Sequence, residues 1–233
     1  MKFSIVVPCY NESKNIPLIL RRFNEVIKRK DVELILVNNG STDDSQEVME
    51  RLLPEYPFTR VEKVQVNQGY GFGILAGLRS AKGEYLAWTH ADMQTNPYDV
   101  IKALDLIENA SNPEKIFVKG SRQGRPLSDV FFTWGMGVFE SIYLGVLLND
   151  INGQPNLFHR SFFDSWEDLP YDFSLDLYAF YMARKQNLEV IRFPVLFTER
   201  IHGHSHWNFG WKSKWKFIKR TLDFSFKLKK RLK

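Results

Sequence analysis

Short apolar runs rich in β-branched residues alternate with helical patterns through the first ninety residues of the chain. Phe3–Val7 and Glu33–Val37 are typical of buried strands, and apolar residues recur every three or four positions within Asn15–Ile27, on one face of a helix. The same alternation continues with a helix from Asp43 or Asp44 to Leu53, a strand at Val61–Val66, a helix at Gly73–Ala81 and a strand at Tyr85–Thr89. This order predicts an α/β fold, with a mostly parallel sheet flanked by helices on both faces.

Three polar clusters follow the predicted strands: Pro8–Asn15, Asn38–Asp44 and His90–Asn96. In a parallel sheet the carboxyl ends of the strands meet at one edge, and ligands bind beyond that edge. We therefore expect these three clusters to form one ligand site. Each cluster also has a purely structural explanation, as a helix cap or an Asx turn.

The pattern loosens after residue 115. Ile116–Lys119 is a predicted strand that leads into the loop GSRQGRP, with a later helix at Asp172–Lys185 and a strand at Leu188–Val195. The aromatic, apolar stretch 129–148 leaves three alternatives open: an acceptor groove, part of the core, or a contact between two subunits.

Charge is concentrated at the end of the chain. The 233 residues carry a net charge of +5, but residues 211–233 alone hold ten Lys/Arg and one acid. The rest of the chain is therefore slightly acidic, which argues against a nucleic-acid-binding protein. A hydrophobic content of 44% with one Cys fits a globular protein without internal disulfides. Without a recognisable signal peptide or membrane span, a cytoplasmic location is expected.

The basic tail has its own pattern. Apolar residues fall on one stripe of a predicted helix, at Trp211, Trp215, Ile218, Leu222 and Phe226, with lysines beside them. Such a helix can lie on an anionic membrane, at the inner face of the membrane in this case. Alternatively, the stripe packs on the body of the protein. We expect a domain over residues 1–210 that stays folded without the basic amphipathic helix 211–233.

Two segments carry groups that can bind ions. In HADMQ, Asp92 and the amide oxygen of Gln94 offer the oxygen ligands that Mg²⁺ and Mn²⁺ prefer. In ERIHGHSHWN, His202, His204 and His206 invite a zinc interpretation, but the absence of Cys beside them favours a loop around a phosphate, together with Arg200.

Taken in order and spacing, VVPCYNE, VNNGSTDDS and NQGYGFGILAGLRSAKGEYLAWTHADMQTNP resemble the family 2 inverting glycosyltransferases, which have the Rossmann-like GT-A fold. Later segments, GQPNLFHRSFF, FSLDLYAF and ERIHGHSHW, resemble the dolichyl-phosphate mannosyltransferase-like branch of polyprenyl-phosphate glycosyltransferases. Enzymes of that branch move a sugar from a nucleotide donor to a polyprenyl phosphate.

The resemblance implies roles for individual residues. The implied donor-binding residues are Pro8, Tyr10, Asn11, Glu12, Asn39, Ser41, Gly69, Gly73, Arg79 and Ala91, with Gly40 and Asp43 completing the second loop. Asp92 and Gln94 match the ligands of Mg²⁺ or Mn²⁺, Asp92 and Asp176 match catalytic acids, and Arg122, Arg200 and His202 match groups near donor or acceptor phosphates.

The chain departs from the family pattern at several positions. His90 replaces the first aspartate of the metal motif, and Asn38-Asn39 replaces an acidic pair that precedes Gly40. PLSDVFFTWGMG replaces an arginine-rich acceptor segment, and His206 stands where the family has a lysine.

Three hypotheses follow from the resemblance and these departures. The first is inverting transfer of a hexose from a UDP- or GDP-sugar to polyprenyl phosphate at the membrane surface, where an anionic acceptor needs positioning rather than a base. The second is transfer to a hydroxyl of a glycan or lipid-linked oligosaccharide, with Asp176 as general base. The third is a nucleotide-sugar-binding protein without catalysis.

Overall fold

The computed structural model describes residues 1–201 and 210–231 and is organised around one seven-stranded sheet. The strands are β1 (Phe3–Cys9), β2 (Val32–Asn39), β3 (Thr59–Val64), β4 (Tyr85–Trp88), β5 (Ile116–Gln123), β6 (Asn156–His159) and β7 (Glu189–Leu196). The helices are α1 (Ile16–Val26), α2 (Ser45–Leu52), α3 (Tyr70–Ser80), α4 (Pro97–Glu108), α5 (Leu127–Leu144), α6 (Arg160–Asp164), α7 (Ser174–Lys185) and α8 (Gly210–Arg231), with short 3₁₀ turns at Leu53–Glu55 and Pro113–Lys115.

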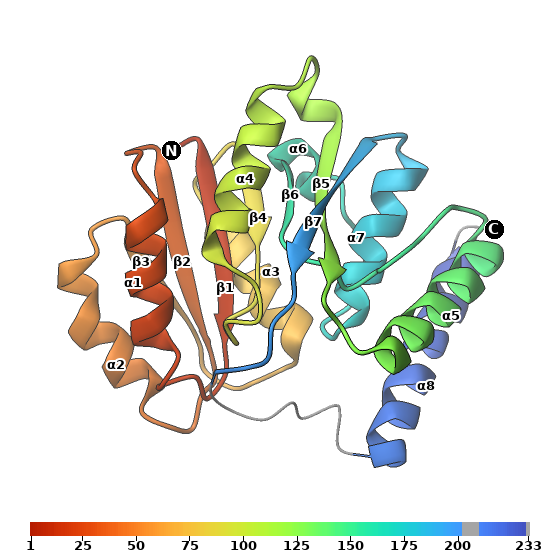
Figure 1. Ribbon diagram of the computed structural model, residues 1–233, viewed down its shortest axis with the longest axis horizontal. Helices are drawn as coiled ribbons and strands as arrows, with labels where there is room; N and C mark the ends of the chain where they lie inside the picture. Colours follow the sequence, from red (N-terminus) through yellow and green to blue (C-terminus); the bar gives the residue numbers. More distant parts are fainter. Residues whose placement is uncertain (202–209, 232–233) are drawn as a thin grey trace.

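The strand order is β3-β2-β1-β4-β6-β5-β7 (Figure 1). Strand β6 runs antiparallel to both of its neighbours, β4 and β5, and every other pairing in the sheet is parallel. The carboxyl ends of β1, β2, β4 and β5 therefore lie at one edge. This arrangement confirms the predicted mostly parallel α/β sheet.

Helices cover both faces of the sheet because alternate strand residues point to opposite sides. On one face Ile5 and Val7 pack with α1 and α4 in one core cluster. On the other face Val6 and Val37 pack with α3 and α7 in a second cluster. Gly77 lets α3 approach the sheet closely, because a Cβ there would lie 2.4 Å from a methyl group of Val6.

Most predicted elements are present with shifted ends. Helix α3 begins at Tyr70, three residues earlier than predicted, and β5 extends four residues beyond Lys119. The short strand β6 was not predicted. The apolar stretch 129–148 is mainly helix α5, which lies at one side of the molecule (Figure 1).

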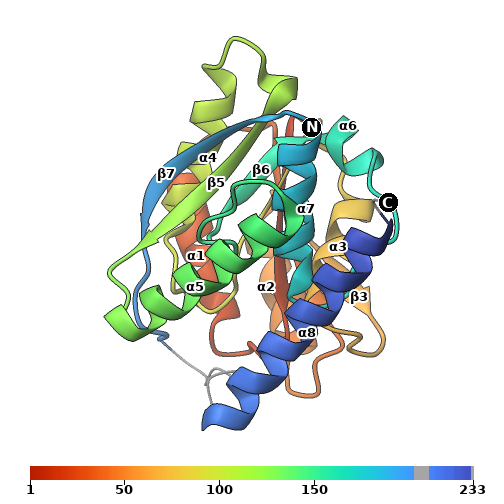
Figure 2. The same ribbon diagram turned by 90° about the vertical axis from the view of Figure 1, so that its right-hand side faces the viewer.

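Helix α8 packs against helices of the same body as the sheet, in line with the second of the two arrangements considered for the tail. It lies alongside α5 and also contacts α7 (Figure 2). Leu228 joins the core, and the Ser225 hydroxyl donates to Glu140 of α5 over 2.8 Å. On the predicted apolar stripe, by contrast, Trp215 and Phe226 are exposed. The face of α8 that packs on the protein is thus adjacent to the predicted apolar stripe. Loss of α8 would expose core residues to solvent.

Among the residues that the structure describes, no helix is both long enough and apolar enough to cross a membrane. The three histidines 202, 204 and 206 lie outside the described residues.

Candidate active site

A cavity of about 550 Å³ opens at the carboxyl ends of the parallel strands. Residues of all three polar clusters line it, as predicted from the sequence. The predicted site residues on its walls are Pro8, Tyr10, Glu12, Asn39, Ala91, Asp92, Gln94, Arg122, Asp176 and Arg200. These residues come from strand ends, from the loops that follow them and from helix α7, and some lie more than a hundred positions apart, so the fold assembles the site.

The loops after β1 and β2 are tied to each other. The Asn11 backbone N–H donates to Ser41 Oγ over 3.0 Å, and the Thr42 N–H donates to Asn11 Oδ1 over 2.8 Å. Asp43 accepts hydrogen bonds from the backbone N–H groups of Ser13 and Ser45. Asn11, Ser41 and Asp43 therefore hold this rim together and are absent from the cavity lining.

Asn39 has one committed and one free polar atom. Its Nδ2 donates to the carbonyl of Gly69 over 3.0 Å, while its buried Oδ1 has no hydrogen-bond partner. Gly73 leaves room for this side chain, because a Cβ there would lie 2.8 Å from the Asn39 amide. Gly69 and Gly73 thus fix the position of Asn39, a residue that lines the cavity and carries an unpaired buried acceptor. A buried unpaired acceptor is unfavourable until a donor reaches it.

Asp92 and Gln94 share one positively charged partner. Arg200 Nη2 lies 2.9 Å from Asp92 Oδ2, and its Nε donates to Gln94 Oε1 over 3.2 Å. The chain segment that carries Arg200 is fixed to the same loop, because Thr198 and Gln94 exchange two hydrogen bonds of 2.9 Å. Two oxygen atoms therefore converge on a single cationic group.

This oxygen pair fits a divalent cation. Mg²⁺ and Mn²⁺ take oxygen ligands, and Mg²⁺ often uses one or two protein groups with water and substrate phosphates. Within the described residues, no three His, Cys, Asp or Glu side chains gather as a metal centre. A cation at Asp92 and Gln94 would accordingly complete its shell with water and phosphate oxygens.

His90 lines the cavity beside Tyr70, with ring centroids 5.9 Å apart. Desolvation lowers the pKa of His90 below its usual value, although Asp92 and Asp176 act in the opposite direction. The imidazole is therefore neutral near pH 7. Tyr70 also stacks on Phe173 at 4.6 Å, so this wall is largely aromatic.

Asp176, at the start of α7, is buried with one free oxygen. Its Oδ1 accepts from Trp88 Nε1 and from Asn156 Nδ2, each over 3.3 Å. Its Oδ2 has no hydrogen-bond partner. Asp176 is one of the residues that line the cavity, and Tyr70, another lining residue, lies close enough for its hydroxyl to interact with this carboxylate.

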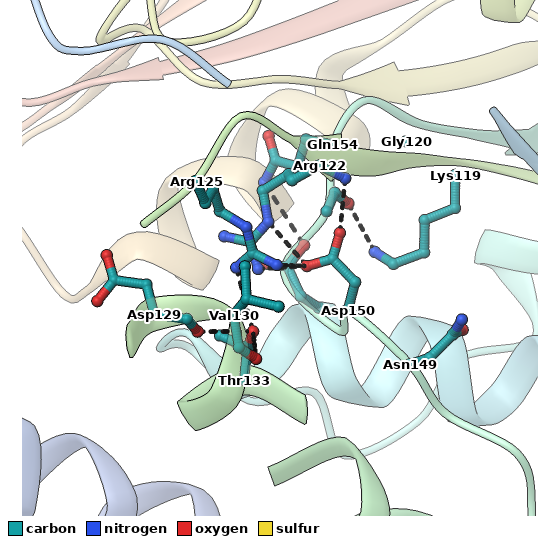
Figure 3. Close-up of polar contacts among 12 residues, drawn as sticks. Lys119, Gly120, Arg122, Arg125, Asp129, Val130, Thr133, Asn149, Asp150 and Gln154 are labelled. Atoms are coloured by element: carbon teal, nitrogen blue, oxygen red, sulfur yellow. Dashed lines mark hydrogen bonds and ion pairs between the residues drawn. The ribbon is translucent and has the colours of Figure 1, made fainter. Parts of the chain in front are cut away.

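Arg122, at the end of β5, is oriented by Asp150. Its backbone N–H and its Nε each donate to the Asp150 carboxylate over 2.8 Å (Figure 3). The arginines hold the pKa of Asp150 below its usual value despite its burial. Arg122 thus reaches the cavity as a fixed cation.

Some predictions for individual residues differ from the structure. Arg79, predicted to bind the donor, is exposed in the last turn of α3, roughly 13 Å along the helix axis from Tyr70. Sequence reasoning also missed lining residues. Among them are Asn67, Tyr70, Asn152, Phe173, Phe197 and Arg220. Phe132, Thr133 and Met136 also line the cavity, and they belong to stretch 129–148, for which an acceptor groove was one of three alternatives. Arg220 comes from α8, and its only signal in the sequence was the positive charge of the tail.

Comparison with solved structures defines the class of the fold. The chain superimposes on glucosyl-3-phosphoglycerate synthase from Mycobacterium tuberculosis, solved with Mn²⁺, UDP-glucose and phosphoglyceric acid, with a TM-score of 0.72 and 18% identity over 96% of this chain and 79% of that one. It also matches mannosyltransferase PcManGT from Pyrobaculum calidifontis, solved with GDP-Man and Mn²⁺, with a TM-score of 0.67 and 20% identity over 88% of this chain and 58% of that one. The fold is therefore that of the GT-A glycosyltransferases.

The family model for glycosyl transferase family 2 matches residues 4–167. Because this match spans more than half of the sequence, the chain belongs to glycosyl transferase family 2.

Two curated relatives are similar over part of their length. Undecaprenyl-phosphate 4-deoxy-4-formamido-L-arabinose transferase of Photorhabdus laumondii is 30% identical over 134 residues, which cover 56% of this chain and 39% of the relative. Dolichol-phosphate mannosyltransferase of Pyrococcus furiosus is 26% identical over 112 residues, which cover 48% of this chain and 32% of the relative. The matched regions thus span less than half of the length of these relatives.

Proposed function

We propose that the protein transfers a hexose from a UDP- or GDP-sugar, with inversion, to a polyprenyl phosphate at the surface of an anionic membrane. One observation carries this proposal: the free Oδ1 of Asn39 and the paired oxygens of Asp92 and Gln94 line the same cavity. The Asn39 oxygen suits the N–H of a nucleotide base. The oxygens of Asp92 and Gln94 suit a cation that binds the diphosphate. The names of the two curated relatives support the acceptor class.

In this proposal the two rim loops bind the nucleotide. Asn39 Oδ1 accepts a hydrogen bond from the base, and Tyr10, half exposed at the rim, offers a ring on which the base stacks. Because the Asn39 amide nitrogen donates to the Gly69 carbonyl, the amide oxygen of Asn39 faces the ligand. An oxygen of an aspartate carboxylate at this position would do the same. The change from an aspartate to Asn39 thus leaves the acceptor in place.

Breaking the bond between sugar and diphosphate leaves negative charge on the departing nucleotide. Mg²⁺ or Mn²⁺ held by Asp92 and Gln94 would stabilise that charge as a Lewis acid. Arg200, which already contacts both ligands, stands beside the leaving phosphates and supplies a further positive charge. His90 remains neutral in this step because burial disfavours its charged form.

The acceptor enters from the side of α5. Arg122, fixed by Asp150, offers a positive charge to an acceptor phosphate there. A phosphate is already anionic at neutral pH, so positioning rather than proton removal activates it. The exposed lysines of α8, Lys219, Lys227 and Lys230, would hold the enzyme against anionic lipid.

A second candidate function rests on Asp176. Its unpartnered, buried Oδ2 could accept the proton of an attacking hydroxyl, which favours a glycan acceptor over a phosphate. A binding protein without catalysis is less consistent with the site, since Asp92, Gln94 and the Asn39 acceptor all line the cavity.

Transfer assays with radiolabelled UDP-glucose and GDP-mannose, Mn²⁺ and farnesyl phosphate test the proposal. We expect a labelled prenyl-phosphate sugar, with a loss of at least about 100-fold in Asp92→Asn. Asp176→Asn separates the acceptor classes. It should lower transfer to the phosphate less than about tenfold, whereas loss of a general base lowers transfer to a hydroxyl about 100-fold or more. Transfer to a free glycan alone would replace the first candidate by the second.

A further inference from the structure

Lys119, in the middle of β5, is a charged side chain to which the proposed function gives no role. It is fully buried, on the face of the sheet that α7 covers, and its amino group lies 5.5 Å from the ring centroid of Phe180 in that helix. Lysine is almost never fully buried unless other groups compensate its charge. The groups around Lys119 must therefore account for its position.

The ammonium group of Lys119 has two hydrogen-bond acceptors. Its Nζ donates to the carbonyl of Gly153 over 2.7 Å and to Asn156 Oδ1 over 2.8 Å. The bond to Gly153 ties β5 to the segment before β6, which is a structural role. The bond to Asn156 reaches a second fully buried side chain, and this one contacts a residue of the active-site cavity.

Asn156 lies between Lys119 and Trp88 in a row of residues across three strands. In the register of the sheet, Asn156 of β6 pairs with Lys119 of β5 and with Trp88 of β4. Residues that are paired across neighbouring strands point to the same face of a sheet. Asn156 Nδ2 and Trp88 Nε1 both donate to Oδ1 of Asp176, each over 3.3 Å. The row therefore lies under the first turn of α7, which carries Asp176.

The hydrogen bonds from Lys119 to Asp176 run in one direction. An ammonium group only donates hydrogen bonds, so the amide oxygen of Asn156 faces Lys119. The amide nitrogen, which only donates, then faces the carboxylate of Asp176. Both contacts favour the same orientation of the amide, and the chain ends on the carboxylate.

The chain also joins two buried charges of opposite sign. Asp176 is 1% exposed, and the groups that donate to it from Trp88, Asn156 and Gln154 are neutral. A buried carboxylate is unfavourable unless an opposite charge compensates it. Burial lowers the pKa of Lys119 to about 7, and among the groups that act in the opposite direction Asp176 has the largest effect. The two charges thus stabilise each other across one amide.

The other charged groups that act on Lys119 do not compensate it. Asp150 favours the ammonium form, whereas Arg122 and Arg192 disfavour it. Asp150 itself accepts from Arg122 Nε over 2.8 Å (Figure 3), and it lies 3.6 Å from Arg192 Nη2. This group holds more positive than negative charge, so Asp176 is the counter-ion of Lys119.

We propose that Lys119 is a positioning residue of the active site: through Asn156 it holds the ionised carboxylate of Asp176 in the wall of the cavity. Asp176 lines the cavity, whereas Lys119 and Asn156 lie behind it. Tyr70, whose hydroxyl interacts with Asp176, is the next residue of the same wall. The effect of Lys119 on catalysis rests on the proposed function, since it acts through Asp176.

Thermal unfolding of a double-mutant cycle tests the pairing without an activity assay. Lys119→Met leaves Asp176 as a buried charge without its counter-ion, so Tm should fall by at least about 6 °C. Adding Asp176→Asn removes that charge, and the double variant should recover at least about half of the loss. A double variant that is no more stable than Lys119→Met would overturn the proposal.

Lys115→Met is the matched control, because Lys115 is exposed just before β5 and receives the same substitution. Its Tm should stay within about 2 °C of wild type. A fall in Tm as large as that of Lys119→Met would mean that the loss does not depend on the buried pair, and would overturn the proposal.

Steady-state transfer kinetics test the positioning role. Lys119→Met should lower kcat at least about twofold, and by no more than Asp176→Asn does, with the KM for the donor within about twofold of wild type. The double variant should have the kcat of Asp176→Asn, because Lys119 then has no carboxylate to position. A residue that only stabilises the fold would leave the kcat of the folded enzyme unchanged.

Asn156→Asp tests the link and keeps Lys119 in place. The new carboxylate still accepts from Lys119, so the buried ammonium keeps a partner and the variant should fold. It presents Asp176 with a repelling oxygen instead of a donor, and kcat should fall at least about twofold. Wild-type kcat in this variant would overturn the proposal.

The two experiments separate this proposal from the proposed function. Recovery of Tm in the double variant, without any transfer by the wild type, would support the pairing of Lys119 with Asp176 and refute the proposed function. Transfer by the wild type, with equal kcat in Lys119→Met and Lys115→Met, would refute the positioning role and leave the proposed function intact.

Discussion

At the scale of single residues, Asn38 and Asn39 are neighbours in the chain with different roles. Asn38 donates to Gln46 Oε1 over 2.6 Å and accepts from the Ser41 N–H over 2.9 Å, so it shapes the loop as an Asx turn would. Asn39 instead keeps a free acceptor in the cavity. The two interpretations of this cluster from the sequence are thus each supported by one residue. The two asparagines differ because Asn38 donates to Gln46 and Asn39 donates to Gly69. No sequence pattern predicts these two pairings.

Arg200 leads to a prediction about metal binding. Without nucleotide, its guanidinium competes with a divalent cation for the oxygens of Asp92 and Gln94. Arg200→Gln should therefore tighten the binding of Mn²⁺ alone by roughly fivefold, as expected for a part-buried ion pair worth about 1 kcal/mol. The same variant should weaken binding of UDP or GDP with Mn²⁺ about tenfold, because a charge beside the diphosphate is lost.

Electron paramagnetic resonance of free Mn²⁺ measures the first effect, and calorimetry measures the second. Arg79→Gln is the control, since Arg79 is exposed at the far end of α3 and should change neither value. Weaker binding of Mn²⁺ alone in Arg200→Gln would contradict the competition.

At the scale of elements, the strands next to the site were predictable and the second half of the sheet was less so. β1, β2 and β4 have continuous apolar runs that end in polar clusters, because both faces of a central parallel strand are buried. β6 has four residues and pairs antiparallel with two strands from elsewhere in the chain. Its local sequence pattern therefore does not predict a strand. α5 lacks a clear polar face, because one side lines the active-site cavity and another exposes Phe131 and Leu127. Its helical period is therefore masked by apolar residues that lie outside the core.

Glu140 provides a test of the packing between α5 and α8. Burial raises the pKa of Glu140 from 4.5 to about 7, although the hydrogen bond from Ser225 acts in the opposite direction. The folded state therefore holds a proton that the unfolded chain releases between pH 4.5 and about 7, so stability falls as pH rises through this window. Above pH 7 this pKa difference between the unfolded and folded states lowers the free energy of unfolding by roughly 3 kcal/mol.

Glu140→Gln keeps an acceptor for Ser225 and cannot ionise. Chemical denaturation should find it about 2 kcal/mol more stable than wild type at pH 8, with little difference at pH 5. Glu25→Gln, at an exposed position of α1, should leave the pH dependence unchanged. A Glu140→Gln variant with the pH dependence of wild type would show that the carboxyl group is not responsible.

At the scale of the whole molecule, α8 is both a structural helix and the carrier of most of the excess charge. Because Leu228 lies in the core, truncation after Gly210 would disturb the fold, and charge variants are the better test of membrane binding. Replacing the exposed Lys219, Lys227 and Lys230 by Gln should weaken binding to phosphatidylglycerol vesicles by roughly 1 kcal/mol per lysine.

Co-sedimentation with vesicles measures this effect. The matched control replaces Lys14, Lys28 and Lys63, which are exposed on the body and give the same change in net charge. Equal losses in the two triple variants would mean that net charge, rather than the α8 surface, determines binding.

We propose that Asn39, Asp92 and Gln94 form a metal-dependent site for a nucleotide sugar. The most direct test is thermal unfolding with UDP- and GDP-sugars, with and without Mn²⁺, in wild type and Asp92→Asn. A ligand at 100 times its Kd stabilises the folded state by about 2.7 kcal/mol, which raises Tm by about 5 °C or more at this chain length. We predict such a rise for one nucleotide, only with Mn²⁺, and its loss in Asp92→Asn. No rise with any nucleotide, or an equal rise without metal or in the variant, would contradict the account.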